Sequence, residues 1–356
     1  MILKAEVNLK TIKANIAKLR TKLGQNVKVC AVLKNNANRQ GDAKIAIGIE
    51  DATDYFASAH IYEAMRIKKA GIKKPVLLVG PCPDFRSAIE HDIEISLNHL
   101  TETKSLAAFT QENELTVKVH IKVNTGLNRY GIQTMEELKE ILEVIQVNPQ
   151  IQVVGLYTHG GSEEVAELNK LVKHFTPFVD HMRGLYPDII VHAAASGAVG
   201  GMLALTAMHF DMVRVGRLLY GATEGYETTI TVTSQIMDIQ HVKKDEAIGY
   251  GGSELATKDS VIGLVPGGYG DVTPIQFSKV VHVLVDGKPC KIMGYVNTDS
   301  FMIDVTGIKN PLYKTVTIIS PDKGQTWLDH VKTSGISTAV IIAIMNYDRA
   351  EVSYKS

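Results

Sequence analysis

The chain has 356 residues, and its 38 basic and 38 acidic side chains give a formal net charge of zero. At roughly 100 to 200 residues per domain, this length predicts two domains, and the balanced charge argues against a nucleic acid as partner. No run of about 18 apolar residues is present and the charged N-terminal segment is unlike a signal peptide, so neither a membrane span nor secretion is expected.

The first part of the chain alternates apolar runs with amphipathic stretches. Apolar residues at spacings of three and four predict a helix over Thr11–Leu23, with Gly24 as its C-terminal cap. The run Val27–Lys34 is too apolar to alternate, which predicts a strand buried on both faces. Later, Thr134 and Glu137 have the spacing of a helix-capping box. Further strand-like runs lie at Tyr55–Ala59, Val76–Gly80, Ile93–Leu97, Val117–Val123, Val153–Gly160, Ile189–Gly197 and Phe210–Gly216.

These strands, most of them followed by a helix-length segment, predict a (β/α)8 TIM-type barrel. A doubly wound open sheet would need a glycine-rich phosphate loop after its first strand, and Lys34–Ala37 is not one. After about Gly225 the pattern becomes alternating strands, with a hairpin signal at Asp286-Gly287 and helical periodicity only around residues 325–333. We therefore predict a barrel over residues 1–225 and a C-terminal all-β domain over residues 226–356. Residues 1–9 have strand character and could pair with the second domain.

Functional side chains of such a barrel stand at the carboxyl ends of its strands. A lysine at this place, such as Lys34, is often a solvated cap, but burial can lower its pKa and make it a nucleophile or a base. The last two strands, where barrel enzymes commonly hold phosphate, end in Ser196-Gly197 and Gly216-Arg217. A reactive lysine beside a phosphate cradle indicates pyridoxal 5'-phosphate (PLP) as cofactor. The other strand ends supply Arg129, His159 and Arg214.

The run AVLKNNANRQG (Ala31–Gly41) resembles the segment that carries the PLP lysine in the alanine racemase family. Further matches cover nearly the whole chain, with the barrel motifs first and the β-domain motifs after them. The resemblance implies an isomerase that interconverts L- and D-alanine for cell-wall precursors. The further matches are Lys122–Ile132, Leu156–Gly160, His192–Gly197, Phe210–Gly221, Gly249–Gly252, Gly263–Asp271, Gly294–Asp304 and Asn346–Tyr354.

The resemblance implies that Lys34 and Tyr250 are the two catalytic bases. Lys34 would hold PLP and act on one face of the substrate α-carbon, whereas Tyr250 would act on the other face. Racemisation needs a proton removed on one face and returned on the opposite one. Tyr250 would come from the partner subunit of a homodimer with shared active sites. Because the ordinary pKa of a phenol is about 10, this role requires nearby cations that lower the pKa of Tyr250.

The resemblance also implies roles for the remaining barrel residues. Arg214 would bond the ring nitrogen of PLP, and an arginine keeps its own proton, so that nitrogen would stay unprotonated. Decarboxylases of similar fold have a carboxylate there, so Arg214 favours a racemase. His159 would lie near the PLP ring and orient Arg214, although a structural histidine explains the same position. Arg129 would neutralise the PLP phenolic oxygen and the substrate carboxylate, and Lys122 matches a position that is often carbamylated.

Two further groups follow from the resemblance. One group would contact the PLP phosphate, and Tyr354 in particular would donate to it. The other group would line the substrate entrance. An ordinary packing or surface role is the alternative for the tyrosines and for Asp299. The phosphate group consists of Ser196, Gly216, Arg217 and Tyr354, and the entrance group of Tyr269, Thr298 and Asp299.

The chain departs from the family pattern at several motif positions. Asn38 replaces a tyrosine that commonly binds the phosphate, Arg217 replaces a small aliphatic residue, and Ala195 stands where asparagine is common. Thr298 replaces a methionine beside the substrate, so a more polar pocket could admit serine or a longer amino acid. A degenerate paralogue without activity and a PLP carrier without catalysis are further alternatives.

The cysteines indicate the cellular compartment. Cys30, Cys82 and Cys290 are widely spaced and form no CxxC motif. This pattern predicts neither a disulfide framework nor a thiolate metal site. A protein of the reducing cytoplasm, with a small-molecule substrate and no metal, is expected.

Overall fold

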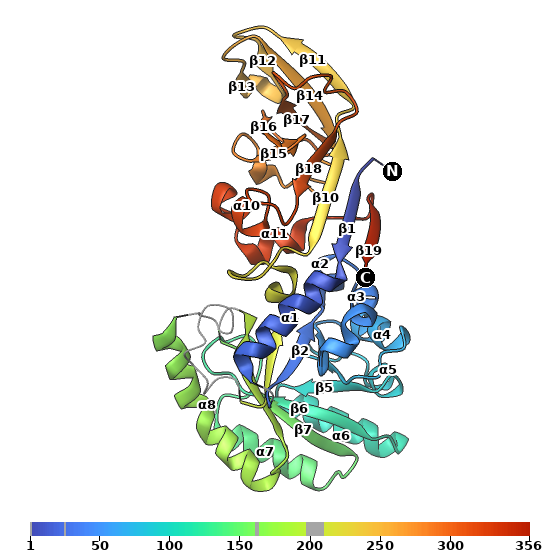
Figure 1. The fold of residues 1–356 in the computed structure, drawn as a ribbon. Coiled ribbons are helices and arrows are strands. Elements are labelled where there is room, and N and C mark those ends of the chain that lie inside the picture. Colours follow the sequence, from blue (N-terminus) through green and yellow to red (C-terminus); the bar gives the residue numbers. More distant parts are fainter. Residues whose placement is uncertain (1, 25, 161–163, 197–209) are drawn as a thin grey trace. The chain divides into compact units, whose positions relative to one another are not determined.

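A computed structural model of the chain describes residues 2–24, 26–160, 164–196 and 210–356 (Figure 1). Its contacts divide the chain into two compact units. The barrel unit comprises Lys13–Ala37 and Gly41–Leu219, and the β-domain unit comprises Met1–Ile12, Asn38–Gln40 and Tyr220–Ser356. Within the described ranges, no helix is both long enough and apolar enough to cross a bilayer.

The barrel unit is a closed ring of parallel strands, which confirms the predicted barrel (Figure 1). The first strand, β2, pairs with β3 on one side and with the last strand, β9, on the other, where Lys28 lies opposite Met212. Each strand overlaps one of the apolar runs of the sequence, and only β7 begins before its run, at Ile151 instead of Val153. The strands are β2 (Lys28–Val32), β3 (Tyr55–Ser58), β4 (Val76–Leu78), β5 (Ile93–Leu97), β6 (Val117–Lys122), β7 (Ile151–Tyr157), β8 (Ile190–Ala195) and β9 (Met212–Val215).

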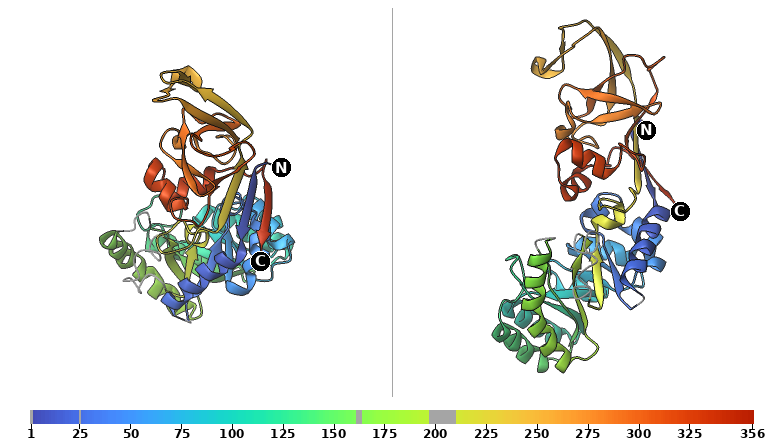
Figure 2. Two further views of the ribbon diagram at one scale, coloured as in Figure 1. Left: turned by 45° about the horizontal axis from the view of Figure 1, so that its top comes forward. Right: turned by 60° about the vertical axis from the view of Figure 1, so that its left-hand side comes forward.

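Helices follow most of these strands and pack on the outside of the ring (Figures 1 and 2). Their ends carry the signals that the sequence predicted. Gly24 follows the first helix with φ +81°, and its backbone N–H donates to the carbonyl of Arg20. Thr134 and Glu137 form the predicted capping box of a later helix. The helices are α1 (Leu9–Leu23), α3 (Asp42–Ile49), α4 (Ile61–Lys69), α5 (Phe85–Glu90), α6 (Leu100–Asn113), α7 (Met135–Gln146) and α8 (Val165–Leu185), with short 3-10 turns at η1 (Glu50–Ala52) and η3 (Arg217–Tyr220).

The β-domain unit is built on a nine-stranded sheet in the order β11-β14-β17-β16-β15-β18-β10-β1-β19. The N-terminal strand β1 lies inside this sheet, antiparallel to β10 and parallel to β19. A separate two-stranded hairpin is formed by β12 and β13. The strands are β1 (Lys4–Asn8), β10 (Ile230–Gln235), β11 (Asp238–Val242), β12 (Ala247–Ile248), β13 (Glu254–Leu255), β14 (Ser260–Pro266), β15 (His282–Val285), β16 (Lys288–Met293), β17 (Ser300–Asp304), β18 (Thr315–Ile319) and β19 (Glu351–Lys355).

The connections of this unit match the sequence in part. Asp286 and Gly287 join β15 to β16 with positive φ at both residues, as the predicted tight hairpin requires. Helix α10 (Trp327–Ser334) lies where helical periodicity was visible. Helix α11 (Thr338–Ile344) was not predicted, because its sequence TAVIIAI is a continuous apolar run, which does not distinguish a helix from a buried strand.

Candidate active site

Lys34 begins a short segment of left-handed backbone at the carboxyl end of β2. Every residue of the segment Asn35–Arg39 has a positive φ, between 51° and 64°. This conformation costs most L-residues about 1–2 kcal/mol each, and asparagine tolerates it best. The segment labelled α2 (Lys34–Asn38) is therefore a left-handed turn and not an α-helix. The three asparagines at positions 35, 36 and 38 are the signal in the sequence that could have revealed it.

The amino group of Lys34 lies in a positively charged environment. Although the residue as a whole is exposed, the protein displaces part of the water around its amino group. This desolvation, followed by the charges of Arg129 and Arg217, lowers the pKa of Lys34, whereas the Glu63 carboxylate raises it. A lysine with a lowered pKa is unprotonated more often, as a nucleophile or base must be.

His159 lies among four cations of the barrel mouth. Burial lowers the pKa of His159 to about 3, and the positive charges of four neighbouring side chains add to this effect. The imidazole is therefore neutral at neutral pH. The four cations are Arg214, Arg129, Lys122 and Lys34. The structure thus brings together five of the predicted site residues at one end of the barrel.

Arg214 is buried on β9 and is 5% exposed. Its Nη1 atom donates to Nδ1 of His192 and its Nη2 atom to the carbonyl of Thr158, at 2.5 and 2.6 Å. The contact with His159 is longer, 3.4 Å, so His192 is the principal residue that orients this arginine, and sequence analysis missed it. Among the described residues, Nε of Arg214 makes no hydrogen bond and no carboxylate pairs with the guanidinium.

A buried chain of hydrogen bonds extends behind Arg214. Nε2 of His192 lies 2.9 Å from Nδ1 of His120, and Nε2 of His120 lies 2.9 Å from Oε2 of Glu94. Burial and the charge of Arg214 hold the pKa of His192 well below its ordinary range, so that ring is neutral. Because Arg214 can only donate, Nδ1 of His192 must accept, and each histidine then donates from Nε2 toward Glu94. The sequence signal for this chain was a polar residue inside each of three apolar runs: Glu94 in IEISL, His120 in VKVHIKV and His192 in IIVHAAASG.

Lys122 is 4% exposed and lies against aromatic rings. Its Nζ atom is 4.9 Å from the ring centre of Tyr130 and 5.5 Å from that of Tyr157. Burial, followed by the charges of Arg129 and Arg214, lowers the pKa of Lys122 to about 8. Among the described residues, no acidic side chain pairs with this amine.

The last two barrel strands, β8 and β9, are neighbours, and their carboxyl ends lie side by side as predicted. The backbone N–H of Gly216 donates to Oγ of Ser196 at 2.8 Å, and the 3-10 turn η3 begins at Arg217. Gly197, which belongs to the same predicted cradle, lies outside the described residues. The Ser196 hydroxyl proton is not used by this bond, so it can still donate to an anion.

The Tyr354 hydroxyl has a hydrogen-bond partner within its own unit. Its hydroxyl donates to the backbone carbonyl of Gln40 at 2.8 Å, within the β-domain unit. Donation from Tyr354 to a phosphate would require this bond to be exchanged, and that role stays a prediction. Asn38, which replaces the family tyrosine, is itself buried.

Tyr250 stands at the tip of the β12–β13 hairpin and is 76% exposed. The three glycines around it, Gly249, Gly251 and Gly252, all have positive φ, between 58° and 77°. This explains the GYGG motif, because glycine adopts such backbone without a steric cost. The hairpin base is held where Glu254 accepts from the Gly294 N–H and pairs with Lys291. The tyrosine is therefore displayed on a fixed support.

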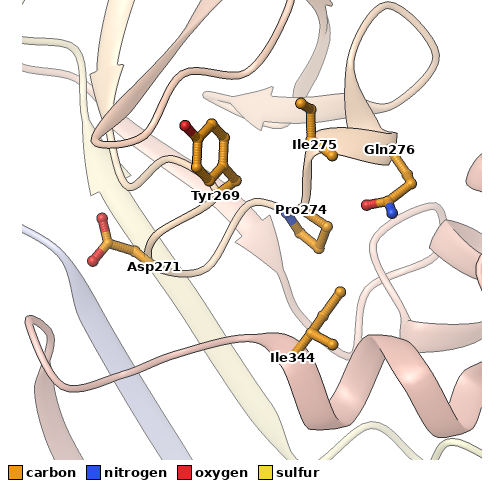
Figure 3. Close-up of a pocket in the computed structure, with 6 residues that line it drawn as sticks. All are labelled: Tyr269, Asp271, Pro274, Ile275, Gln276 and Ile344. Atoms are coloured by element: carbon orange, nitrogen blue, oxygen red, sulfur yellow. The ribbon is translucent and has the colours of Figure 1, made fainter.

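The entrance residues gather within the β-domain unit. Oγ1 of Thr298 donates to the Tyr269 hydroxyl at 2.7 Å, and Arg349 bridges Asp299 and the buried Asp271. Tyr269 and Asp271 also line a cavity of about 330 Å³, which Figure 3 shows. Its other lining residues are Pro274, Ile275, Gln276 and Ile344.

Comparison with known proteins identifies both halves of the chain. Residues 7–224 match the family model "Alanine racemase, N-terminal domain", and residues 229–352 match "Alanine racemase, C-terminal domain". The chain is 31% identical over 315 residues to alanine racemase 1 of Bacillus subtilis, an alignment that covers 85% of this chain and 79% of that protein.

Solved structures agree with this similarity. An alanine racemase of Bacillus anthracis with bound L-Ala-P matches with a TM-score of 0.89 and 26% identity, over 100% of this chain and 95% of that one. An alanine racemase of Bartonella henselae with covalently bound pyridoxal phosphate has the same fold, with a TM-score of 0.88, 21% identity and 99% of each chain covered. With both family models matched in order over most of its length, the chain belongs to the alanine racemase family, a family of isomerases.

Proposed function

We propose that this protein is a PLP-dependent alanine racemase in which Lys34 holds PLP and Lys34 and Tyr250 serve as the two bases. The observation that carries the proposal is the setting of Arg214, a buried cation bonded to a neutral histidine and to carbonyl oxygens. Its Nε–H suits the ring nitrogen of PLP as a donor. A decarboxylase would be expected to place a carboxylate there.

The donor set of the barrel mouth fits PLP and an amino acid. Both carry anionic groups, and this end of the barrel gathers the cations Lys34, Lys122, Arg129 and Arg214 together with Arg217. When bound, PLP supplies an electron sink that makes the α-hydrogen of the amino acid acidic. Arg129 would hold the substrate carboxylate, and the Ser196 hydroxyl and Gly216–Arg217 would hold the phosphate.

The residues of this chain then move a proton between two faces. Lys34, with its lowered pKa, takes the α-proton from one face of the substrate. The Tyr250 phenol acts on the other face. Because Tyr250 is exposed on its hairpin, we infer that it completes the site of a partner subunit, near the cations around Lys34. The active assembly is a homodimer that shares its sites.

Lys122 is suited to carbamylation. A carbamate forms when a neutral amine attacks CO₂ and releases a proton, and a pKa of about 8 leaves a larger neutral fraction than an ordinary lysine has. The modification would replace a buried cation by an anion between Arg129 and Arg214. It would thereby brace Arg129 for the substrate carboxylate.

Serine is a second candidate substrate. The Thr298 hydroxyl, which stands where the family commonly has methionine, gives the entrance a polar group bonded to Tyr269. A hydroxyl-bearing substrate has a hydrogen-bonding partner there that a methionine does not offer. We also infer a cytoplasmic location, which the three unpaired, buried cysteines support.

A chiral assay tests the proposed function. Purified protein with added PLP is given a panel of L-amino acids, and D-alanine is expected to form fastest, with Lys34→Ala inactive. Faster formation of D-serine would favour the second candidate. Release of CO₂ without a D-isomer would contradict a racemase. If the protein binds PLP at Lys34 but no D-isomer or CO₂ forms, a non-catalytic carrier or a degenerate paralogue is favoured.

A further inference from the structure

Helix α4 supplies a carboxylate to the left-handed turn that follows Lys34. Oε1 of Glu63 accepts the backbone N–H of Asn36 at 2.8 Å, and Oε2 of Glu63 accepts the Ser58 hydroxyl at 2.5 Å. Glu63 is 8% exposed, and Ser58, at the end of β3, is fully buried. The Glu63 carboxylate is thus held by Ser58 at the end of β3, and it in turn holds the left-handed turn that follows β2.

Helix α4 also holds the C-terminal end of the turn, near Asp42. Arg66, one turn after Glu63, binds the buried carboxylate of Asp42 through Nε and Nη2, at 3.2 and 2.6 Å. The N–H of Asp42 donates to Oδ1 of Asn36 at 2.9 Å, and the N–H of Gly41 donates to the Asn36 carbonyl at 3.0 Å. Asn36 therefore joins both ends of the turn, and Glu63 is its link to helix α4.

The turn needs such support because its backbone is unfavourable by itself. A run of left-handed residues persists only where the surrounding structure holds it. The bond from the Asn36 N–H to a carboxylate is charge-assisted and partly buried, so it is among the stronger contacts available. Lys34 precedes Asn36 by two residues, so a relaxed turn would move the lysine. A misplacement of about 1 Å at a reacting group can cost about 100-fold in rate.

We propose that Glu63 is a positioning residue for Lys34: by accepting the Asn36 N–H it holds the left-handed turn and fixes where the lysine emerges from the barrel. The proposal rests on the proposed function for its effect on turnover, because that effect requires Lys34 to be catalytic. Its effect on the turn does not depend on PLP or on catalysis.

Two substitutions separate the hydrogen bond from the charge. Glu63→Ala removes both, whereas Glu63→Gln removes the charge but keeps an amide oxygen that can accept the Asn36 N–H. Glu63→Gln is therefore the matched control, whereas Arg66→Met on the same helix loosens the Asp42 end of the turn and leaves the bond from the Asn36 N–H to Glu63 in place. The PLP-free proteins are compared by hydrogen–deuterium exchange of peptides that cover residues 34–41, and the PLP-loaded proteins by kcat and KM.

Glu63→Ala is expected to speed exchange in this segment by about tenfold or more, while peptides from β5 and β6 stay unchanged. Its kcat is expected to fall by about 100-fold with little change in KM. Glu63→Gln should stay within a few-fold of the parent protein in both readouts, and Arg66→Met should have smaller effects on exchange and on kcat than Glu63→Ala, because it keeps the bond to the Asn36 N–H.

Unchanged exchange over residues 34–41 in a folded Glu63→Ala protein would overturn the proposal, as would an equal loss of kcat in Glu63→Gln. If Glu63→Ala does not fold, Ser58→Ala replaces it, since it frees Oε2 of Glu63 and should loosen the segment to a smaller degree. Faster exchange without any loss of kcat, together with an active Lys34→Ala, would instead contradict the proposed function and leave the positioning intact.

Discussion

The barrel unit and the β-domain unit present their site residues in opposite ways. In the barrel, Arg214 and Lys122 are 5% and 4% exposed and lie in a network formed within that unit. In the β-domain, Tyr250 and Tyr269 are 76% and 49% exposed. The barrel residues are therefore organised within their own unit, whereas the two tyrosines of the β-domain are largely exposed. The two proposed bases therefore differ in their surroundings: Lys34 lies among the cations of the barrel, whereas Tyr250 is exposed on the β-domain.

The largest effect is expected from removing either base. Lys34→Ala and Tyr250→Phe should each lower racemisation by about 10³-fold or more, because each removes one of the two proton-transfer groups. Only Tyr250→Phe should still exchange the α-hydrogen of D-alanine with solvent deuterium, because Lys34 still works on its own face. Proton NMR in D₂O measures this exchange. Loss of exchange in both variants would show that Tyr250 is not the second base.

A smaller loss is expected within the barrel, and it should depend on burial. Arg214→Gln should lower kcat by about 100-fold, since Arg214 is locked to His192 and Thr158 and would face the PLP ring. Arg217→Gln should lower kcat only a few-fold, because the backbone N–H at that position remains. Steady-state kinetics of the two variants at saturating PLP provide the comparison. Equal losses of kcat in the two variants would show that the buried Arg214 and the half-buried Arg217 contribute alike.

Mixing two inactive variants tests whether the two units meet across subunits. In an equal mixture of Lys34→Ala and Tyr250→Phe chains, half of the dimers are hybrids, and one site of each hybrid is intact. Activity should therefore recover to about a quarter of the parent value. Native mass spectrometry confirms that chains have exchanged. Exchange without recovery would place both bases of a site in one chain.

The smallest effect concerns stability and pH. The pKa of Lys122 is about 8 in the folded protein against 10.5 for an ordinary lysine, so the unfolded chain binds more protons than the folded protein between pH 8 and pH 10.5. In CO₂-free buffer the free energy of unfolding should rise across this window, by at most about 1.4 kcal/mol per pH unit. Urea unfolding of the parent protein and of Lys122→Met measures this, and the variant should lack this contribution. Saturating bicarbonate should weaken the slope if the lysine is carbamylated.

The sequence predicted the architecture because each barrel strand is a compact apolar run and each long helix carries its own periodicity. It predicted the site less completely. The left-handed turn at Asn35–Arg39 follows from local asparagine chemistry that a search for glycine loops overlooks. Glu94, His120 and His192 come together only because neighbouring strands bring distant residues into one layer. Tyr354 was assigned by motif, and its contact with Gln40 depends on β19 lying beside β1, which no pattern in either segment specifies.

The chain of imidazoles between Arg214 and Glu94 has a consequence for the field at the barrel mouth. A buried cation ordinarily lies against its counter-ion, which cancels most of its potential. Here the compensating negative charge is held two rings away, at the far end of an ordered relay of neutral donors and acceptors. The positive pole of this chain is the Arg214 guanidinium, which no carboxylate among the described residues touches. An electron-rich heterocycle arriving at that pole would meet an arginine whose orientation is already set.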